Sequence, residues 1–235
     1  MLLREALDAG VVPTEVFTAL EVDEHSVEWG LVERAASVGA VVHRVVADVL
    51  ARAVDTVTPQ GVAAIASRPE VDLPTAVAAA AVGPLALVLV DVNDPGNAGT
   101  LVRAAEAAGA AAVLFCGASV EPWNPKCVRA SAGALFHVPV SSGGEPVAVL
   151  DLLSRAGVRS AATVVRGGTV YDHADLRGPV AVVLGNEAHG LPGPLLDRVD
   201  LRLTIPMAGR AESLNVAMAG SVLCFEALRQ RRAGT

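Results

Sequence analysis

Short runs of consecutive apolar residues recur along the C-terminal two-thirds of the chain, and stretches with helical spacing separate several of them. The run from Leu85 to Val92 is rich in Leu and Val throughout, which is typical of a strand covered on both faces of a parallel sheet. Strands that alternate with helices predict an α/β fold with a doubly covered parallel sheet. Further runs of this kind occupy 111–116, 160–165, 180–184 and 201–205.

The first part of the chain alternates helical and strand-like pieces more weakly, and it predicts a small α/β domain. These pieces occupy 2–9, 15–20, 27–38 and 41–45. The segment 67–75 holds two prolines and mixed charge without any period, which indicates a domain boundary. We therefore expect an N-terminal domain at 1–70, a linker at 71–84 and a larger domain at 85–235. A final helix is predicted over 213–232, because apolar positions recur at helical spacing and arginines close the segment.

Composition narrows the classes of protein that this pattern allows. The 235 residues are 52% hydrophobic with only 3% aromatics, which suits small side chains packed between helices and a sheet. The net charge of −7 excludes a protein that holds nucleic acid by its overall charge, so any RNA site must be a local basic patch. The longest apolar stretch, 75–92, is broken by Gly83-Pro84, so we expect no membrane partner.

The three cysteines are widely spaced, and they fit neither a disulfide framework nor a metal site of the CxxC kind. We therefore expect reduced thiols and a cytoplasmic location. No metal is expected.

Three loops that follow predicted strands concentrate glycines and polar side chains. They cover 91–99 (DVNDPGNAG), 184–191 (LGNEAHGL) and 205–216 (IPMAGRAESLNV). Open α/β sheets bind ligands at the carboxyl ends of their strands, which is where these loops fall. Taken singly, the first loop is more typical of a helix start with Asn97 as the capping residue, and the third loop could likewise be a helix start capped by Ser213.

Taken together, the loops resemble the three signature motifs of the SpoU/TrmH family of RNA ribose methyltransferases. The resemblance covers roughly 85–232 and implies a SPOUT fold, in which the C-terminal segment forms a deep trefoil knot. Such a knot is a rare exception to the rule that chain connections are not threaded. The motifs are Asn97-x-Gly99-x-x-x-Arg103, then Gly185-x-Glu187-x-x-Gly190-Leu191, then Ile205-Pro206-Met207 followed by Ser213-Leu214-Asn215-Val216.

The resemblance implies that the protein transfers a methyl group from S-adenosylmethionine to a ribose 2′-hydroxyl of structured RNA. Ribosomal RNA is the expected substrate and transfer RNA the alternative; a homodimer through the knotted domain is also implied. The catalytic residues implied are Arg103, Asn97, Glu187, Ser213 and Asn215. The cofactor residues implied are Thr163, Leu184, Gly185, Asn186, Gly190, Ile205, Pro206, Met207, Ser213 and Leu214. The RNA-binding residues implied are Arg103, Lys126, Arg129 and Ser131, within a segment that also supplies a local basic patch.

The N-terminal segment is similar to the companion domain of this family, which resembles a ribosomal protein and helps to select RNA. The run from Thr56 to Ala63 (TVTPQGVA) matches the stretch that ends this domain in many members. The resemblance implies a partial domain that lacks the opening helix and strand.

A mechanism in which Arg103 removes the hydroxyl proton conflicts with the basicity of guanidinium, whose pKa lies above about 12. We therefore expect Arg103 to bind the phosphate of the target nucleotide and to orient the hydroxyl, while the proton leaves for a neighbouring group or water. His189 has no partner visible in the sequence. A lone histidine in a loop is more often simply solvated, so we assign it no role.

Two further classes of protein compete with the methyltransferase. A non-catalytic RNA-binding protein could retain the knotted fold, but the motif residues are all intact. A dinucleotide-dependent oxidoreductase is disfavoured, because the first loop lacks the G-x-G-x-x-G spacing and no acidic residue stands where a ribose ligand is expected.

Overall fold

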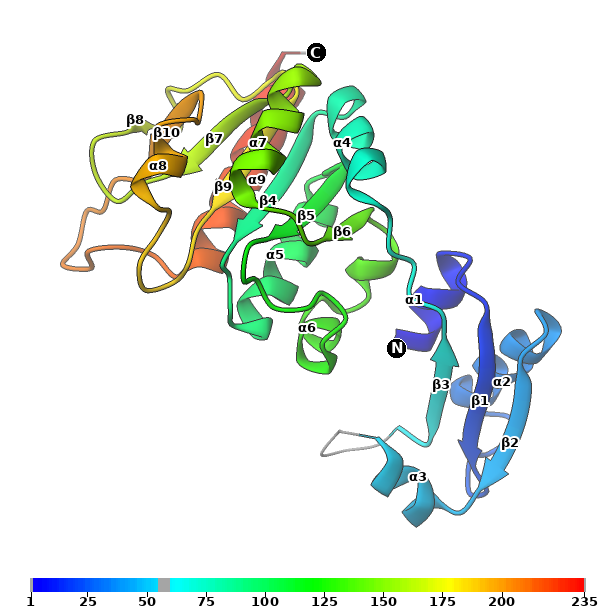
Figure 1. Cartoon of the computed structure of the whole chain (residues 1–235). Coiled ribbons are helices and arrows are strands. Elements are labelled where there is room, and N and C mark those ends of the chain that lie inside the picture. Colours follow the sequence, from blue (N-terminus) through cyan, green and yellow to red (C-terminus); the bar gives the residue numbers. More distant parts are fainter. Residues whose placement is uncertain (1, 55–59, 235) are drawn as a thin grey trace. The chain divides into compact units, whose positions relative to one another are not determined.

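The computed structural model describes residues 2–54 and 60–234, and the chain divides into two compact units between Pro69 and Glu70. The first unit is a three-stranded sheet in the order β2-β1-β3, with β1 parallel to β2 and antiparallel to β3 (Figure 1). Val16, Val32 and Ala35 are buried at its centre, between the sheet and the helix α2. Its elements are α1 (Leu2–Asp8), β1 (Pro13–Ala19), α2 (Val27–Ser37), β2 (Val41–Val45), α3 (Ala47–Ala53) and β3 (Val62–Ala66).

The run that matches the end of the companion domain, Thr56 to Ala63, lies partly on β3, and its residues 56–59 lie outside the described residues. The pieces predicted upstream of that run correspond to α1, β1, α2 and β2. A role of this unit in RNA selection stays a prediction.

The second unit contains a seven-stranded sheet in the order β6-β5-β4-β9-β7-β10-β8, and every neighbouring pair of strands is parallel. The predicted α/β fold with a parallel sheet is confirmed, while the knot stays a prediction. The strands are β4 (Leu85–Val90), β5 (Ala112–Cys116), β6 (Val140–Ser142), β7 (Arg159–Thr163), β8 (Thr169–Val170), β9 (Val180–Leu184) and β10 (Leu201–Thr204). The helices are α4 (Leu73–Val82), α5 (Pro95–Ala107), α6 (Pro125–Ala130), η1 (Ala134–Phe136), α7 (Pro146–Arg155), α8 (Gly193–Leu196) and α9 (Val216–Ala233).

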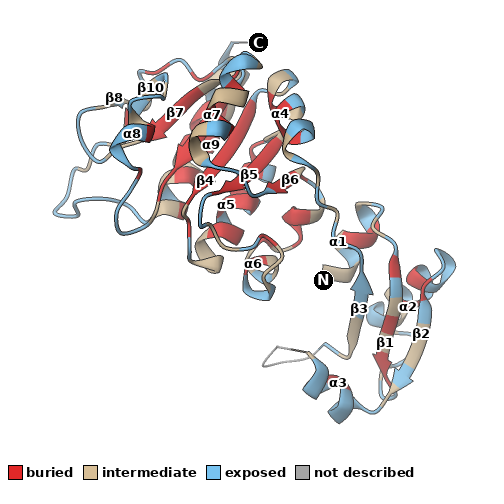
Figure 2. Ribbon diagram, in the orientation of Figure 1, coloured by how far each residue is buried: buried red, intermediate tan, exposed pale blue. Residues whose placement is uncertain are grey.

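Helices cover both faces of this sheet, as the unbroken apolar character of its central strands requires. Alternate residues of β4 point to opposite faces: Leu87 packs with α5 and α9, whereas Val88 packs with α4, α7 and α8. All residues of β4, β5 and β9 are buried, and Figure 2 shows these strands as the buried centre of the unit.

The predicted linker at 71–84 is wrong, because most of it is the helix α4 of the second unit. The carboxylate of Asp72 accepts a hydrogen bond from the backbone N–H of Thr75 at 2.9 Å and so caps this helix. Ala76 and Ala80 are buried against the sheet. The Ala-rich sequence lacks the alternation of apolar and polar positions that marks an amphipathic helix, so the pattern gave no signal for it.

The short elements β6, β8, η1 and α8 were not predicted, since two to four residues carry too little periodicity. The elements α3 and β3 of the first unit were not predicted either. The final helix begins at Val216, three residues later than predicted, because Asn215 is its N-cap. Among the residues that the structure describes, no helix has the length and apolar character needed to cross a membrane.

The helix α9 packs closely on α5 and β9, and Gly220 makes this approach possible. A Cβ atom at this position would lie 2.2 Å from Cδ2 of Leu101 and 2.7 Å from Cδ1 of Leu184. Both leucines are fully buried, so neither has space to retreat.

We expect Gly220→Ala to destabilise the second unit. The overlap places its cost near the upper end of the ~1–3 kcal/mol range for overpacking, while the better helix propensity of alanine returns about 1 kcal/mol. The net loss in the free energy of unfolding, measured by denaturant titration, should be about 2 kcal/mol. Gly193→Ala is the matched control, because nothing lies within 4 Å of its Cβ position. Equal stability of the two variants would contradict this account of the packing.

Candidate functional site

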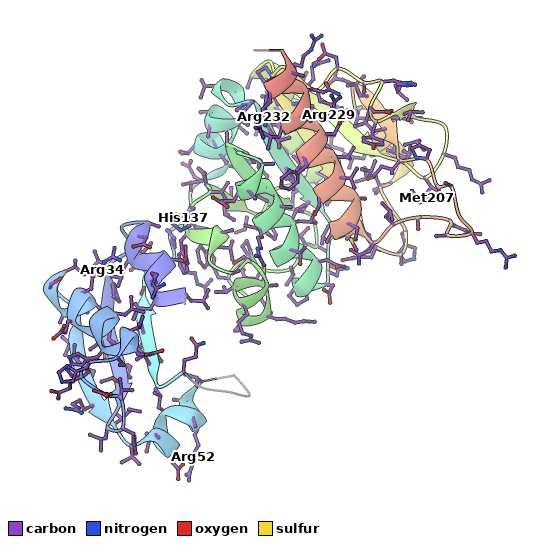
Figure 3. All side chains as sticks on the ribbon, turned by 180° about the vertical axis from the view of Figure 1, so that it is seen from behind. Arg34, Arg52, His137, Met207, Arg229 and Arg232 are labelled. Carbon is purple, nitrogen blue, oxygen red and sulfur yellow. The ribbon has the colours of Figure 1, made fainter. Side chains whose placement is uncertain are left out.

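The three polar loops meet at the carboxyl edge of the sheet. Strands β4 and β9 are neighbours, and β7 and β10 follow next to β9, so the loops that leave these four strands lie side by side. The strand order reverses at β4. The next strands of the chain, β5 and β6, lie on one side of β4, whereas the later strands β9, β7 and β10 lie on its other side. Such a reversal of strand order is where open α/β sheets form a ligand crevice. In Figure 3, Met207 marks the third loop, and Arg229 and Arg232 mark the far end of α9.

A chain of hydrogen bonds joins one residue from each loop. The Nδ2 of Asn215 donates to Oδ1 of Asn97 at 3.0 Å, and the Nδ2 of Asn97 donates to Oε1 of Glu187 at 3.2 Å. The backbone N–H of Asp94 donates to the same carboxylate oxygen at 3.3 Å. Asn97 and Glu187 are 90 positions apart in the chain, and Glu187 and Asn215 are 28 positions apart. Only the sheet topology brings the three residues together.

Two of these residues also stand at the start of a helix. Asn215 caps α9, since its Oδ1 accepts from the backbone N–H of Ala217 at 2.8 Å and of Met218 at 3.3 Å. Asn97 lies in the first turn of α5, which Asp94 caps. The predicted caps Asn97 and Ser213 are therefore wrong: Asp94 caps α5, and Asn215, which was predicted only as a site residue, is also the cap of α9.

Asn186 fastens the second loop to the first. Its Nδ2 donates to the backbone carbonyl of Asp91 at 2.9 Å, and its Oδ1 accepts from the backbone N–H of Ala188 at 2.9 Å and of His189 at 3.1 Å. The loop closes tightly, because a Cβ at Gly185 would lie 2.5 Å from the carbonyl carbon of Gly190. Glycine is required at position 185 for this reason.

A carboxylate and a lysine lie next to the hydrogen-bonded chain. The Oδ1 of Asp94 accepts from the backbone N–H of Asn97 at 2.8 Å, and Nζ of Lys126 lies 3.4 Å from Oδ2. The pKa of Asp94 is lowered, chiefly by the bond from the Asn97 backbone and further by Lys126. Asp94 is therefore a fixed negative charge at neutral pH.

A cavity of about 290 Å³ opens between the second and third loops and the end of β7. Apolar side chains such as Leu203, Ile205 and Val216 line it together with the polar residues Asn186 and Glu187. Of the predicted cofactor residues, those that line the cavity are Thr163, Gly185, Asn186, Gly190, Ile205, Met207, Ser213 and Leu214.

Two predicted cofactor residues, Leu184 and Pro206, are not part of the cavity wall. The Leu184 side chain is fully buried and packs against α9 near Gly220, so it supports the loop from the core. A direct contact of this side chain with a cofactor is therefore excluded by its position.

The predicted catalytic residues divide into two places. Glu187 and Ser213 line the cavity, and Asn97 and Asn215 are bonded to Glu187 directly or through one another. Arg103 does not line the cavity; it lies six residues beyond Asn97 on α5, about 9 Å along the helix axis. Its exposed guanidinium forms no hydrogen bond or ion pair within the described part of the chain.

The predicted RNA-binding segment contains one residue that cannot contact RNA in this structure. Ser131 is fully buried, and its hydroxyl donates to the Val128 carbonyl at 2.8 Å, so the prediction for Ser131 is wrong. Gly99 explains the burial, because α5 and α6 approach so closely that a Cβ there would lie 2.9 Å from the Ser131 nitrogen. Lys126 and Arg129 are exposed on α6.

Sequence reasoning missed three residues with polar or charged side chains at this edge. His189 and Glu212 line the cavity, and Asp94 joins the first loop to Lys126. His189 was set aside because it lacked a partner in the sequence, and its partner is Asn186, three residues earlier. The tight turn at Gly190 brings His189 and Asn186 together. Hydrophobic periodicity does not predict a turn of this kind.

Neither cysteine nor metal chemistry is indicated. Burial raises the pKa of Cys116, Cys127 and Cys224 to about 12, so none of these thiols is a nucleophile at neutral pH. Within the residues described, no group of histidine, cysteine and carboxylate side chains could hold a metal ion.

Comparison with known proteins assigns the chain to a class. The model of the SpoU rRNA Methylase family matches residues 84–225. The 23S rRNA (guanosine(2553)-2′-O)-methyltransferase RlmP of Bacillus subtilis is 36% identical over 179 residues, which are 76% of this chain and 68% of that protein. The chain therefore belongs to the SpoU rRNA methylase family, as the resemblance of the three loop motifs predicts.

Solved structures agree over nearly the whole chain. An S-adenosylmethionine-bound rRNA methyltransferase from Sinorhizobium meliloti matches with a TM-score of 0.83 and 30% identity, over 97% of this chain and 84% of that one. The SpoU methyltransferase AviRb from Streptomyces viridochromogenes, in complex with the same cofactor, matches with a TM-score of 0.83 and 27% identity, over 99% and 88%.

We expect Asn215→Ala and Asn215→Asp to separate the two roles of Asn215. Alanine removes the cap of α9 and should lower the free energy of unfolding by about 1 kcal/mol. Aspartate keeps an oxygen that accepts from the helix N–H groups but loses the donor to Asn97, so stability should remain close to that of the natural protein. Denaturant titration measures both, and an equal loss in both variants would show that the bond to Asn97, rather than the cap, stabilises this helix start.

Proposed function

We propose that the protein is an S-adenosylmethionine-dependent methyltransferase that modifies a ribose 2′-hydroxyl of ribosomal RNA. The observation that carries the proposal is the hydrogen-bonded chain of Asn215, Asn97 and Glu187 beside a cavity lined by two of the three family motifs. The names of the relatives support the same reaction and the same substrate class.

The cavity fits the cofactor chemically. Adenine and ribose need an apolar slot with a few placed polar groups, and Leu203, Ile205 and Val216 stand here beside Asn186 and Glu187. The loops at Gly185 and Leu214 bring backbone edges to the same wall. When bound, the cofactor supplies an activated methyl group on a positively charged sulfur. No metal is needed for this chemistry, because the sulfur leaves as a neutral group.

The residues of the chain then serve to place the ribose. Glu187 is held by Asn97 and by the Asp94 backbone, so its carboxylate has a fixed position at the cavity wall. A carboxylate that is held in this way accepts hydrogen bonds from sugar hydroxyls with little loss of conformational entropy. Ser213 stands on the opposite loop, where its hydroxyl is available to a ligand.

The cations that approach RNA phosphates belong to the second unit. Arg103 is exposed on α5 and has no partner in the part of the chain that the structure describes, and Lys126 is exposed on α6 beside Asp94. The segment 1–69 contains ten acidic and five basic residues, so an RNA contact of the first unit must depend on shape and hydrogen bonds rather than on its overall charge.

Arg103→Ala should abolish most methyl transfer without loss of cofactor affinity. Arg103 lies outside the cavity, so S-adenosylhomocysteine should bind with unchanged affinity in calorimetry. The single-turnover rate of tritiated methyl transfer to ribosomal RNA should fall about 100-fold, because a misplaced nucleophile loses its alignment. Arg103→Lys should have a rate between those of Arg103→Ala and the natural protein, since lysine keeps the positive charge but lacks the planar guanidinium that donates two parallel hydrogen bonds.

Arg155→Ala is the matched control, because Arg155 is also exposed at the surface of a helix, and the control should keep the natural rate. Normal turnover by Arg103→Ala would remove Arg103 from the mechanism. The proposed function itself fails if the natural protein binds NAD rather than S-adenosylhomocysteine, or if it transfers no methyl to any RNA. Methyl transfer to transfer RNA in preference to ribosomal RNA would replace the substrate by the alternative.

A homodimer that forms through α9 is part of the proposal. Met218 and Phe225 are 63% and 49% exposed, and they stand seven residues apart on one side of this helix, with Val222 between them. Large exposed apolar side chains on one helix face are typical of protein interfaces. The cytoplasmic location rests on the number and spacing of the cysteines, and it stays a prediction.

We expect the natural protein to be a dimer by light scattering at micromolar concentration. The double variant Met218→Glu with Phe225→Glu should be monomeric, because two carboxylates on each copy would be buried without partners. Val82→Glu is the control; Val82 is 91% exposed on α4, on the other face of the sheet, and its replacement should leave the dimer intact. A natural protein that is monomeric would overturn this part of the proposal.

A further inference from the structure

We infer that His189 accepts the proton of the ribose 2′-hydroxyl during methyl transfer, through its Nε2 atom. This inference rests on the proposed function and names the proton acceptor in the same site. His189 lines the cavity between the second and third loops and is exposed, so a substrate that enters the cavity can reach its ring.

Backbone contacts fix the orientation of the Asn186 amide. Its Nδ2 donates to the Asp91 carbonyl, and its Oδ1 accepts from two backbone N–H groups. A flipped amide would set N–H against N–H and carbonyl against carbonyl, so the backbone fixes which atom faces the histidine.

The tautomer of His189 follows from this orientation. Its Nδ1 lies 3.2 Å from Oδ1 of Asn186, which can only accept a hydrogen bond. Nδ1 must therefore carry the hydrogen in the neutral ring, and Nε2 keeps its lone pair. A base whose far side is held by a fixed acceptor is the arrangement found in enzymes that activate hydroxyl groups.

The other groups at the site are less suited to receive the proton. The titratable side chains that share the cavity with His189 are Glu187 and Glu212, and carboxylates as a class are much weaker bases than imidazole. Glu187 is also occupied by hydrogen bonds from Asn97 and Asp94. Arg103 is a guanidinium, which does not accept a proton.

The proposed step is balanced in atoms and electrons. The 2′-hydroxyl proton moves to Nε2 of His189, while an electron pair of the 2′-oxygen forms the new bond to the methyl carbon. The electron pair of the broken carbon–sulfur bond stays on the sulfur, which leaves uncharged. The imidazolium then releases its proton to water, which restores the neutral ring.

His189→Ala tests the inference by single-turnover methyl transfer. The rate should fall by about 10²- to 10⁴-fold, the usual contribution of a positioned base. The melting temperature should stay unchanged, and the affinity for S-adenosylhomocysteine should fall far less than the rate, because His189 is one of many residues that line the cavity. Imidazole added to the buffer should restore part of the rate of His189→Ala, because it can occupy the vacated space and take the proton. The matched control is His173→Ala, which removes an exposed histidine that does not line the cavity.

A second measurement does not depend on activity. Nitrogen NMR of the histidine rings should show His189 with the hydrogen on Nδ1 in the neutral form.

Three outcomes would overturn the inference while leaving the proposed function intact. One is a natural single-turnover rate in His189→Ala. Another is a loss that imidazole does not restore, which would indicate a structural role. The third is a neutral ring protonated on Nε2. Absence of methyl transfer by the natural protein would instead refute the proposed function.

Discussion

The hydrogen-bonded chain from Asn215 through Asn97 to Glu187 is the interaction on which the rest of the site depends. Each member comes from a different loop, and each loop leaves a different strand of the parallel sheet. The chain fixes the start of α5, the start of α9 and the loop after β9 relative to one another. Its loss would leave the Glu187 carboxylate free to adopt other rotamers, and the cavity wall would no longer be ordered before a ligand arrives.

Close packing behind the loops makes this chain possible. Gly220 lets α9 approach Leu101 and Leu184, and Gly99 lets α5 approach α6. These contacts leave no room for a Cβ atom, so the helices that carry Asn97 and Asn215 cannot slide without a steric cost. The same packing that positions Asn97 buries Ser131, which explains why one residue of a basic segment became structural while Lys126 stayed at the surface.

The charges of the protein are arranged locally rather than globally. The net charge is −7, yet Arg103 is exposed on α5 and has no partner among the described residues. A single cation placed near the site can orient one phosphate, whereas the overall charge repels the rest of the RNA backbone. This balance favours recognition that depends on shape and on a few contacts over tight, nonspecific binding. The proposed proton transfer also depends on a local contact. The backbone orients the Asn186 amide, whose oxygen faces Nδ1 of His189 and leaves Nε2 as the nitrogen with a lone pair.

The sequence by itself determined the fold class, the strands β4, β5 and β9, and the three loops that carry the site. These features are local: a buried strand is an apolar run, and a motif is a set of residues at fixed spacing. The tertiary structure alone decided which residues meet. It joined Asn97 to Asn215 across 118 positions, turned the expected linker into α4, buried Ser131, and gave His189 a partner. Packing and strand order set these outcomes. Both depend on contacts between distant segments, so the hydrophobic periodicity of a single segment does not predict them.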